Sequence, residues 1–133
     1  MSIGKRGPKQ TNPKKCFYAW LNTGTTDKAA KALAREGVLG RGGKPLHFNT
    51  IRRGAYLYVL SNPKETREIF RERMLFFALE DAMWDNFLIE KAKFVYAMND
   101  VKAFYSWLYD NNLIGRAIEF GHVPPDFSIE SVL

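Results

Sequence analysis

The residues best suited to a chemical role lie in one short run, F-N-T-I-R-R, whose polar members are Asn49, Thr50, Arg52 and Arg53. An arginine can bind guanine through two hydrogen bonds, and an asparagine can bind adenine in the same way. Such contacts are made from the first turn of a helix that lies in the major groove. The run therefore predicts contact with the base edges of a duplex. The alternative is an ordinary helix whose exposed face is basic.

Positive charge is concentrated in the same half of the chain. Residues 1–60 hold 12 Lys or Arg and only two acidic residues, whereas residues 61–133 hold 8 basic and 12 acidic residues. This asymmetry indicates that one half faces a polyanion, since each phosphate that Lys or Arg neutralises releases bound counterions. We predict that the polyanion is double-stranded DNA, with RNA as the alternative. The predicted DNA-contacting residues are Lys5, Arg6, Lys9, Lys14, Lys15, Lys28, Arg41, Lys44, His47, Asn49, Thr50, Arg52 and Arg53.

Cysteine and histidine, which supply most zinc sites and many nucleophilic sites, are scarce. Cys16 is the only cysteine, and the two histidines, His47 and His122, lie far apart in the sequence. Neither an internal disulfide nor a thiolate zinc site is therefore predicted. Cys16 is expected to be a small buried apolar residue. Because no local signature joins a nucleophile to a base, we predict no catalytic residues and no enzymatic activity.

Two weaker patterns concern small ligands. Asp81 and Asp85 are four apart on a predicted helix, beside Glu80, and could hold a metal ion. A solvated helix face is the favoured interpretation of these carboxylates. The glycine-rich segment 37–46 departs from a phosphate-binding loop, because Pro45 stands where that motif requires Ser or Thr. We therefore predict neither a metal nor a cofactor.

Apolar residues at helical spacing predict an all-α fold in four segments. The segments are a flexible basic arm (1–15), a DNA-binding unit of three helices (16–61), a helical oligomerisation region (62–114) and an extended C-terminal tail (115–133). The arm can follow phosphates or enter a minor groove, and a solvated tail is its alternative. The C-terminal tail docks either on its own domain or on a protein partner, and the sequence leaves both open.

Three helices are predicted in the basic half, over residues 15–22, 27–36 and 48–60. Gly24 and Gly37 are expected to end the first two helices, and Asn49 or Thr50 is expected to cap the third. The segment between the second and third helices is predicted to be a loop, which could include a small hairpin or wing.

The acidic half is predicted to form a helical hairpin that also associates with other copies. A helical region from Pro63 to about Met98 carries more apolar surface than one exposed helix presents. A second helix, capped by Asn99-Asp100, runs to about Asn112. The apolar surface can pack on that helix, on another subunit, or on both. The predicted oligomerisation residues are Phe70, Met74, Phe77, Trp84 and Leu88.

The composition is typical of a folded protein. The chain of 133 residues is 46% hydrophobic, which is enough to build a core. No apolar run approaches the roughly 18 residues of a membrane-crossing helix, and no signal-peptide pattern follows the basic N-terminus. We therefore expect a soluble protein of the cytoplasm, or of the host cytoplasm if the source is a virus, with no membrane partner.

The stretch from Thr26 to Leu60 resembles helix-turn-helix domains of the homeodomain-like superfamily. The matching parts are the Ala-rich helix over residues 27–36, the break at Gly37 and the N-T-I-R-R start of the third helix. The run G-G-K-P-L-x-F-N-T-I-R-R is also similar to the DNA-binding tail of large serine recombinases, where a Gly-Gly turn precedes a comparable helix start. The catalytic domain of those recombinases is absent here, so the resemblance implies DNA binding without catalysis.

The order of parts resembles that of phage terminase small subunits, which combine a helix-turn-helix, a helical oligomerisation region and a C-terminal segment for the large subunit. The run D-V-K-A-F-Y-S-W-L, residues 100–108, is similar to a helix found in some of them, although Ser106 interrupts its aromatic pair. This resemblance implies a ring-forming recognition factor for viral genome packaging. The alternatives are a dimeric helix-turn-helix transcription regulator and a viral interaction protein that binds an acidic host protein.

Overall fold

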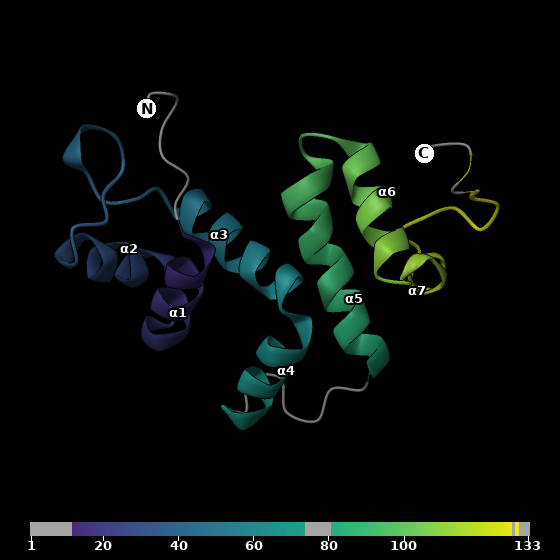
Figure 1. Cartoon of the computed structure of the whole chain (residues 1–133), viewed down its shortest axis with the longest axis horizontal. Helices are drawn as coiled ribbons and strands as arrows, with labels where there is room; N and C mark the ends of the chain where they lie inside the picture. Colours follow the sequence, from purple (N-terminus) through teal and green to yellow (C-terminus); the bar gives the residue numbers. More distant parts are fainter. Residues whose placement is uncertain (1–11, 74–80, 129, 131–133) are drawn as a thin grey trace. The chain divides into compact units, whose positions relative to one another are not determined.

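The computed structural model describes residues 12–73, 81–128 and 130, and the regular secondary structure of these ranges is entirely helical (Figure 1). The α-helices are α1 (Pro13–Thr23), α2 (Thr26–Arg35), α3 (Phe48–Ser61), α4 (Pro63–Glu72), α5 (Asp81–Ala92), α6 (Val101–Asp110) and α7 (Ile114–Glu119). A 3-10 turn, η1 (Arg41–Gly43), precedes α3, and a π-helical turn, η2 (Lys93–Ala97), continues α5. The predicted all-α class is confirmed.

Tertiary contacts divide the chain into an N-terminal unit, residues 1–58, and a C-terminal unit, residues 59–133. The division falls inside α3, so the last turn of this helix belongs to the C-terminal unit, slightly before the boundary expected at Ser61-Asn62-Pro63. None of the helices in the described ranges combines the length and the apolar character that a membrane crossing requires.

Local hydrogen bonds fix the ends of the first two helices. The side chain of Asn12 accepts hydrogen bonds from the backbone N–H groups of Lys14 and Lys15, and so begins α1. Gly24 and Gly37 both adopt the left-handed backbone conformation and close the last turns of α1 and α2. The two predicted helix ends are therefore confirmed.

The N-terminal unit has a small apolar core to which α1, α2 and α3 contribute Cys16, Leu33 and Ile51, respectively. α1 and α3 approach closely at Gly54, where an added Cβ atom would lie 2.7 Å from Sγ and 2.9 Å from Cβ of Cys16. Packing therefore requires glycine at this position, although glycine weakens a helix. Burial raises the pKa of the Cys16 thiol to about 11. The interpretation of Cys16 as a buried apolar residue is confirmed.

The helical region expected between Pro63 and about Met98 is not continuous. α4 ends at Glu72, and the ring of Phe70 packs edge-on against Trp84 and Phe87, with centroids 5.8 Å and 6.2 Å apart. Residues 70 and 84 would lie about 21 Å apart along a straight helix, so these two residues do not belong to one continuous helix. Burial of the three rings against one another is the physical reason, because contacts between aromatic side chains dominate the energetics of small cores.

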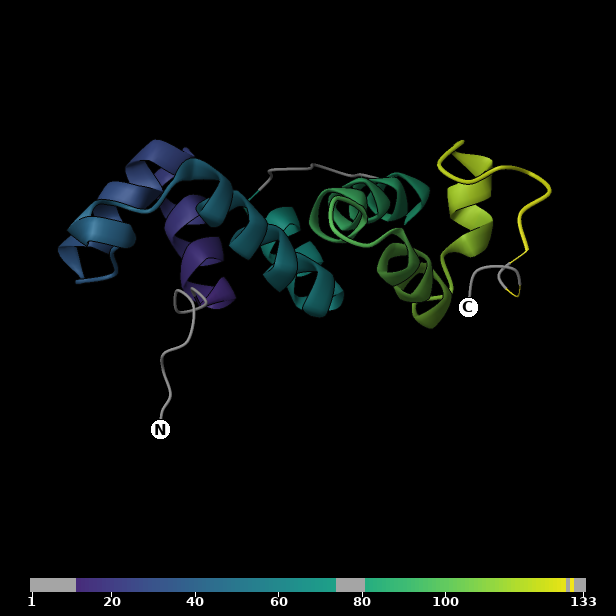
Figure 2. The same cartoon turned by 90° about the horizontal axis from the view of Figure 1, so that it is seen from above.

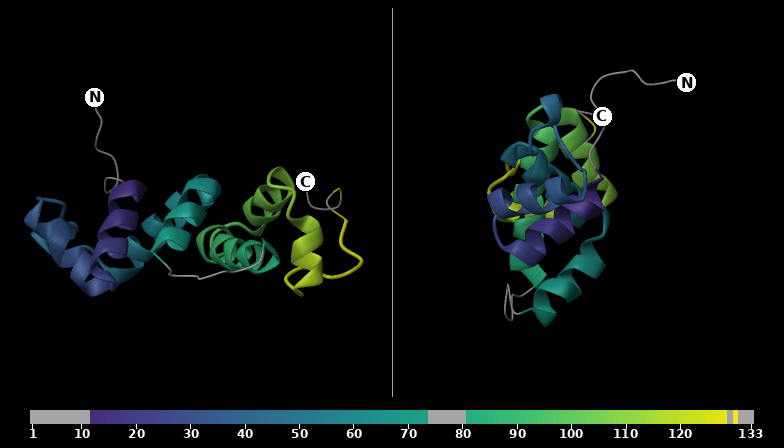
Figure 3. Two further views of the ribbon diagram at one scale, coloured as in Figure 1. Left: turned by 90° about the horizontal axis from the view of Figure 1, so that it is seen from below. Right: turned by 90° about the vertical axis from the view of Figure 1, so that its left-hand side faces the viewer.

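In the C-terminal unit, α5, α6 and α7 contact one another and lie side by side in both Figure 2 and Figure 3. The side chain of Asp100 accepts a hydrogen bond from the N–H of Lys102 and begins α6, as predicted. Phe104 and Leu108 of α6 are buried, as is Ile89 of α5. These apolar contacts give the C-terminal unit a core of its own.

The C-terminal tail is less extended than predicted, because Ile114–Glu119 form α7. Ala117 of α7 is fully buried, and burial of this helix face favours helical structure over an extended chain. Farther on, Val123 is buried and the ring of Phe127 lies 4.8 Å from the ring of Tyr105, between centroids. The described part of the tail therefore docks on its own unit.

Candidate nucleic-acid interface

The first turn of α3 is organised by His47. Nδ1 of His47 accepts a hydrogen bond from the backbone N–H of Asn49 (3.1 Å), and its carbonyl oxygen accepts one from the N–H of Thr50 (3.0 Å). His47 therefore caps the helix. The expected cap at Asn49 or Thr50 is wrong, because both residues lie inside the first turn. Both are exposed, as contact with base edges requires.

The two arginines that follow are less exposed than their neighbours. Arg52 and Arg53 are half-buried, while Ile51 and Ala55 of the same helix are buried in the core. Arginine can bury its aliphatic stem and keep its guanidinium at the surface. Partial burial is therefore compatible with contact between these guanidinium groups and a ligand. The sequence places both arginines on the exposed side of the first turn, and the structure leaves them half-buried there.

The glycine-rich loop between α2 and α3 extends away from the helices of its unit (Figure 1). The N–H of Gly40 donates a hydrogen bond to the carbonyl oxygen of Lys44 (2.7 Å), which closes the loop around η1. Gly42 and Gly43 both have positive φ angles of 68° and 73°, a conformation that disfavours other residues. The loop thereby presents Arg41 and Lys44, both exposed, at its end. The regular structure in this loop is the 3-10 turn η1, and the loop does not form the small hairpin or wing that the sequence left open.

A shallow cleft of about 350 Å³ brings Arg52 together with the start of α2. Gly24, Thr25 and Thr26 line one part of it, and Tyr56 lines another. Backbone N–H groups at the start of a helix carry partial positive charge. Together with the guanidinium of Arg52, they make the cleft favourable for a negatively charged group.

Further cations lie along α1 and α2. Lys14 and Lys15 occupy the first turn of α1, which contains no acidic residue, although a helix start is stabilised by negative charge. Lys28 is also exposed, and Lys31 pairs with Asp27 at 3.5 Å in a strongly exposed ion pair. An external anion would stabilise this arrangement. Of the predicted contact residues, three lie outside the described residues: Lys5, Arg6 and Lys9.

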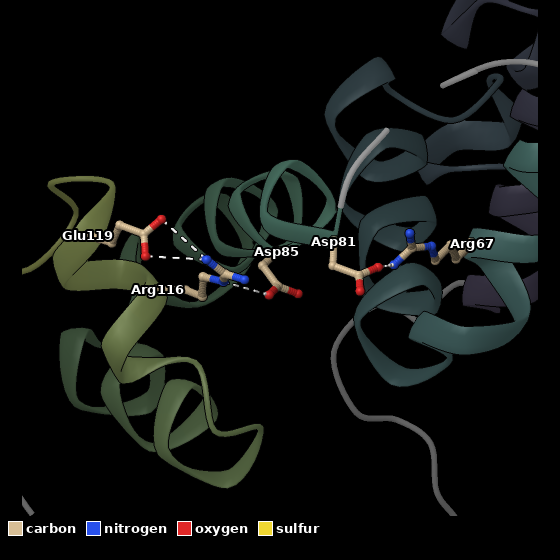
Figure 4. A network of polar contacts seen from close by, with 5 residues as sticks. All are labelled: Arg67, Asp81, Asp85, Arg116 and Glu119. Atoms are coloured by element: carbon tan, nitrogen blue, oxygen red, sulfur yellow. Dashed lines mark hydrogen bonds and ion pairs between the residues drawn. The ribbon is translucent and has the colours of Figure 1, made fainter. Parts of the chain in front are cut away.

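Of the carboxylates considered for a metal site, Asp81 and Asp85 are held by arginines (Figure 4), and Glu80 lies outside the described residues. Asp81 pairs with Arg67, while Oδ2 of Asp85 accepts a hydrogen bond from Nε of Arg116 at 3.2 Å. Arg116 also pairs with Glu119 (3.2 Å). The two aspartates therefore bind different arginines and do not converge on one point. In the described ranges, no group of three potential metal ligands comes together.

Three of the five predicted oligomerisation residues lie in the interior of the C-terminal unit. Phe70, Trp84 and Leu88 are all buried, and Met74 and Phe77 lie outside the described residues. The three buried side chains are part of the packing of the chain itself, so they do not form an exposed face for a second copy. Self-association stays a prediction.

One exposed residue beside the candidate interface, Phe48, was not singled out from the sequence. Phe48 lies three and seven positions before Ile51 and Ala55, which is the spacing of one apolar helix face. The structure leaves Phe48 46% exposed, while Ile51 and Ala55 are buried. Position 48 was predicted to begin the helix, and the structure confirms this start, but helical spacing alone does not indicate that the Phe48 side chain stays exposed.

Comparisons with known proteins do not add a family to this description. No protein-family model matches the chain, and searches of curated proteins and of solved structures find no similar protein.

Proposed function

We propose that this chain binds double-stranded DNA through its N-terminal unit, with the first turn of α3 facing the base edges. The observation that carries the proposal is the exposure of Asn49 and Thr50 on a capped helix start beside Arg52. Such a turn is suited to the major groove, where these residue types discriminate between bases. The described residues of this unit include nine Lys or Arg and only two acidic residues, which favours a polyanionic partner.

In this proposal α2 and α3 act as the two helices of a helix-turn-helix. Support comes from the well-defined ends on both sides of the loop, at Gly37 and at His47, which give α2 and α3 fixed limits. The loop with Arg41 and Lys44 then contacts the phosphates beside the groove. Phosphate contacts fix the orientation of a protein on the duplex, while base contacts determine the sequence preference.

The wider role that we propose is that of an oligomeric, non-enzymatic recognition factor for viral genome packaging. It rests on the resemblance of the chain to phage terminase small subunits in the order of its parts. Light scattering after size exclusion, with and without a short duplex, tests this role. A ring-sized complex with DNA would support it. A dimer with DNA would favour a transcription regulator, which binds two half-sites about one helical turn apart.

DNA binding itself is tested by a double variant, Arg52→Ala with Arg53→Ala, and fluorescence anisotropy on a labelled duplex. Losing one good base contact costs on the order of 1–3 kcal/mol, so we expect affinity to fall about tenfold or more. The matched control, Arg71→Ala with Arg73→Ala, removes the same charge from the exposed end of α4 and should leave affinity nearly unchanged. Equal losses in both variants would contradict the placement of α3 at the bases. Circular dichroism verifies that both variants fold.

A further inference from the structure

Phe48 is a large apolar side chain held at the surface by its neighbours. It is 46% exposed, and its ring centroid lies 4.3 Å from that of His47, with a tilt of 32° between the rings. On the same helix, the guanidinium carbon of Arg52 lies over the Phe48 ring, 5.4 Å from its centroid. These three residues form a surface cluster, which we call the aromatic platform (His47, Phe48 and Arg52).

The platform is preorganised by contacts within the chain. The hydrogen bond that Nδ1 of His47 accepts from the N–H of Asn49 restricts the imidazole ring. The cation–π contact with Arg52 similarly restricts the Phe48 ring. A ligand that stacks on these rings therefore has less side-chain freedom to remove than it would at a mobile surface phenylalanine.

The surroundings of the platform point to the kind of ligand. It borders the loop that exposes Arg41 and Lys44, and Arg52 also lines the cleft at the start of α2. A flat apolar surface among cations complements a flat apolar group attached to anions. A nucleobase on its phosphate backbone has this chemistry, since every base offers a π face for stacking on an aromatic side chain.

We propose that the aromatic platform stacks on a nucleobase displaced from the helical stack, so that the protein prefers duplex DNA containing an unpaired or easily unstacked base. Apolar side chains inserted at base steps are a known means of kinking a duplex, and unstacking requires the least energy where a base is already unpaired. The inference rests on the proposed DNA binding and specifies the form of DNA that the site selects.

The test compares the full chain and its variants on two labelled DNA duplexes, one fully paired and one with a single extra adenine. We expect the wild type to bind the bulged duplex several-fold more tightly. Phe48→Ala should weaken binding to the bulged duplex by about fivefold, the lower end of the effect of losing one base–aromatic stack, and so remove the preference for the bulge. Binding to the paired duplex and the slope of affinity against salt should change much less, because no phosphate contact is removed.

Two further variants keep the test independent of folding. Phe48→Leu retains an apolar side chain but removes the π face, and should also abolish the preference for the bulge. Phe120→Ala makes the same truncation as Phe48→Ala at an exposed phenylalanine of the C-terminal unit, 38% exposed, and should change neither affinity. Quenching of 2-aminopurine placed at the bulge reports stacking directly, and should occur with the wild type but not with Phe48→Leu.

The possible outcomes distinguish failure of the stacking role from failure of the proposed DNA binding. Equal binding of the two duplexes, unaffected by Phe48→Leu, would overturn the stacking role while leaving DNA binding intact. Tighter binding of the corresponding bulged RNA would overturn the choice of DNA. Binding to neither duplex would overturn the proposed function itself.

Discussion

The two units use their positive charges in different ways. In the C-terminal unit, Arg116 joins α7 to α5 through Asp85, and Arg67 joins α4 to α5 through Asp81. The N-terminal unit supplies two carboxylates, Asp27 and Glu36, to nine described Lys and Arg residues. Carboxylates outnumber Lys and Arg in the C-terminal unit, 12 to 8, whereas most cations of the N-terminal unit have no carboxylate of their own unit to pair with.

This difference shows that a count of basic residues does not by itself locate a binding surface. Arginines that pair with carboxylates across helices contribute to the cohesion of a unit, and they produce little net field outside it. Cations in excess of the nearby carboxylates leave a positive potential that attracts a polyanion. The contrast can be tested by removing charges or close contacts from one unit and comparing the same change in the other.

The largest expected effect follows from removing cations from the N-terminal unit by glutamine substitution. The variant replaces Lys14, Lys15, Arg41 and Lys44, all exposed. We expect duplex affinity to fall more than about tenfold at low salt, because phosphate contacts are lost. The slope of log affinity against log salt should flatten by about 0.9 for each lost contact. Salt titrations followed by fluorescence anisotropy measure both quantities.

The matched control removes four cations from the C-terminal unit by the same substitution. It replaces Lys64, Arg71, Lys93 and Lys102, which are also exposed. We expect a much smaller loss of affinity and an almost unchanged slope. If both variants lost affinity equally, net charge of the whole chain would control binding, and the contrast between the units would fail.

The second effect compares two helical glycines. Gly54→Ala places a Cβ atom 2.7 Å from Sγ of Cys16, and such overpacking typically costs about 1–3 kcal/mol of unfolding free energy. Gly115→Ala in α7 meets no atom within 4 Å and should instead stabilise by about 0.5–1 kcal/mol, because alanine favours a helix. Urea unfolding of both variants measures the difference.

A second substitution tests whether the cost arises at this contact. Cys16→Ala removes the sulfur but keeps the Cβ atom, which would lie 2.9 Å from a Cβ at position 54. Adding it to Gly54→Ala should therefore recover part of the loss. Additive losses in the double variant would show that α1 and α3 do not meet as described.

The third effect is smaller and lies in the C-terminal unit. Arg116→Ala removes the ion pairs with Asp85 and Glu119. The Arg116 side chain is 36% exposed, so solvent screens these pairs, and we expect a loss of at most about 1 kcal/mol. The loss should shrink as salt is added, and duplex affinity should not change. A clear drop in duplex affinity would place Arg116 and its carboxylate partners in the binding site. The contrast between the charges of the two units would then fail.

The smallest effect concerns pH and His122. Burial lowers the pKa of His122, and the charge of Lys93 lowers it further, although Glu90 opposes them. The folded protein therefore favours the neutral ring. The stability that this shift in the pKa of His122 contributes is complete above the unfolded pKa of about 6.5. It is lost as the pH falls through that value toward the lower folded pKa.

His122→Gln tests this dependence, since glutamine can still donate a hydrogen bond to the amide oxygen of Asn86, which Nε2 of His122 contacts at 2.6 Å. As the pH decreases from about 8 to about 5, the melting temperature of the wild type should fall more steeply than that of the variant. Parallel curves would show that His122 does not contribute to acid sensitivity.

Helix ends could be predicted from the sequence where the interactions that fix them are local. Gly24, Gly37 and Asp100 act within a few residues of their own helices, and each ends or begins a helix as expected. The candidate site was predicted in part for the same reason, because Asn49 and Thr50 are exposed by the geometry of a single turn.

Features that depend on distant residues could not be predicted in this way. The break after α4 is fixed by Phe70 packing on Trp84, and the folded tail by the burial of Ala117 and by the packing of Phe127 on Tyr105, 22 positions away. The same holds for Gly54, whose requirement comes from Cys16 on another helix. Periodicity identifies an apolar face, but it does not say which other residues of the chain cover that face.

The contact between Cys16 and Gly54 makes the chain's only thiol an internal reporter. Thiol reagents attack the thiolate, and both burial and a pKa of about 11 suppress that form at neutral pH. Alkylation of Cys16 therefore requires α1 and α3 to separate, so the labelling rate measures the frequency of that opening event. Adding duplex DNA should slow the labelling if the bound unit opens less often, which gives a kinetic view of binding without any introduced probe.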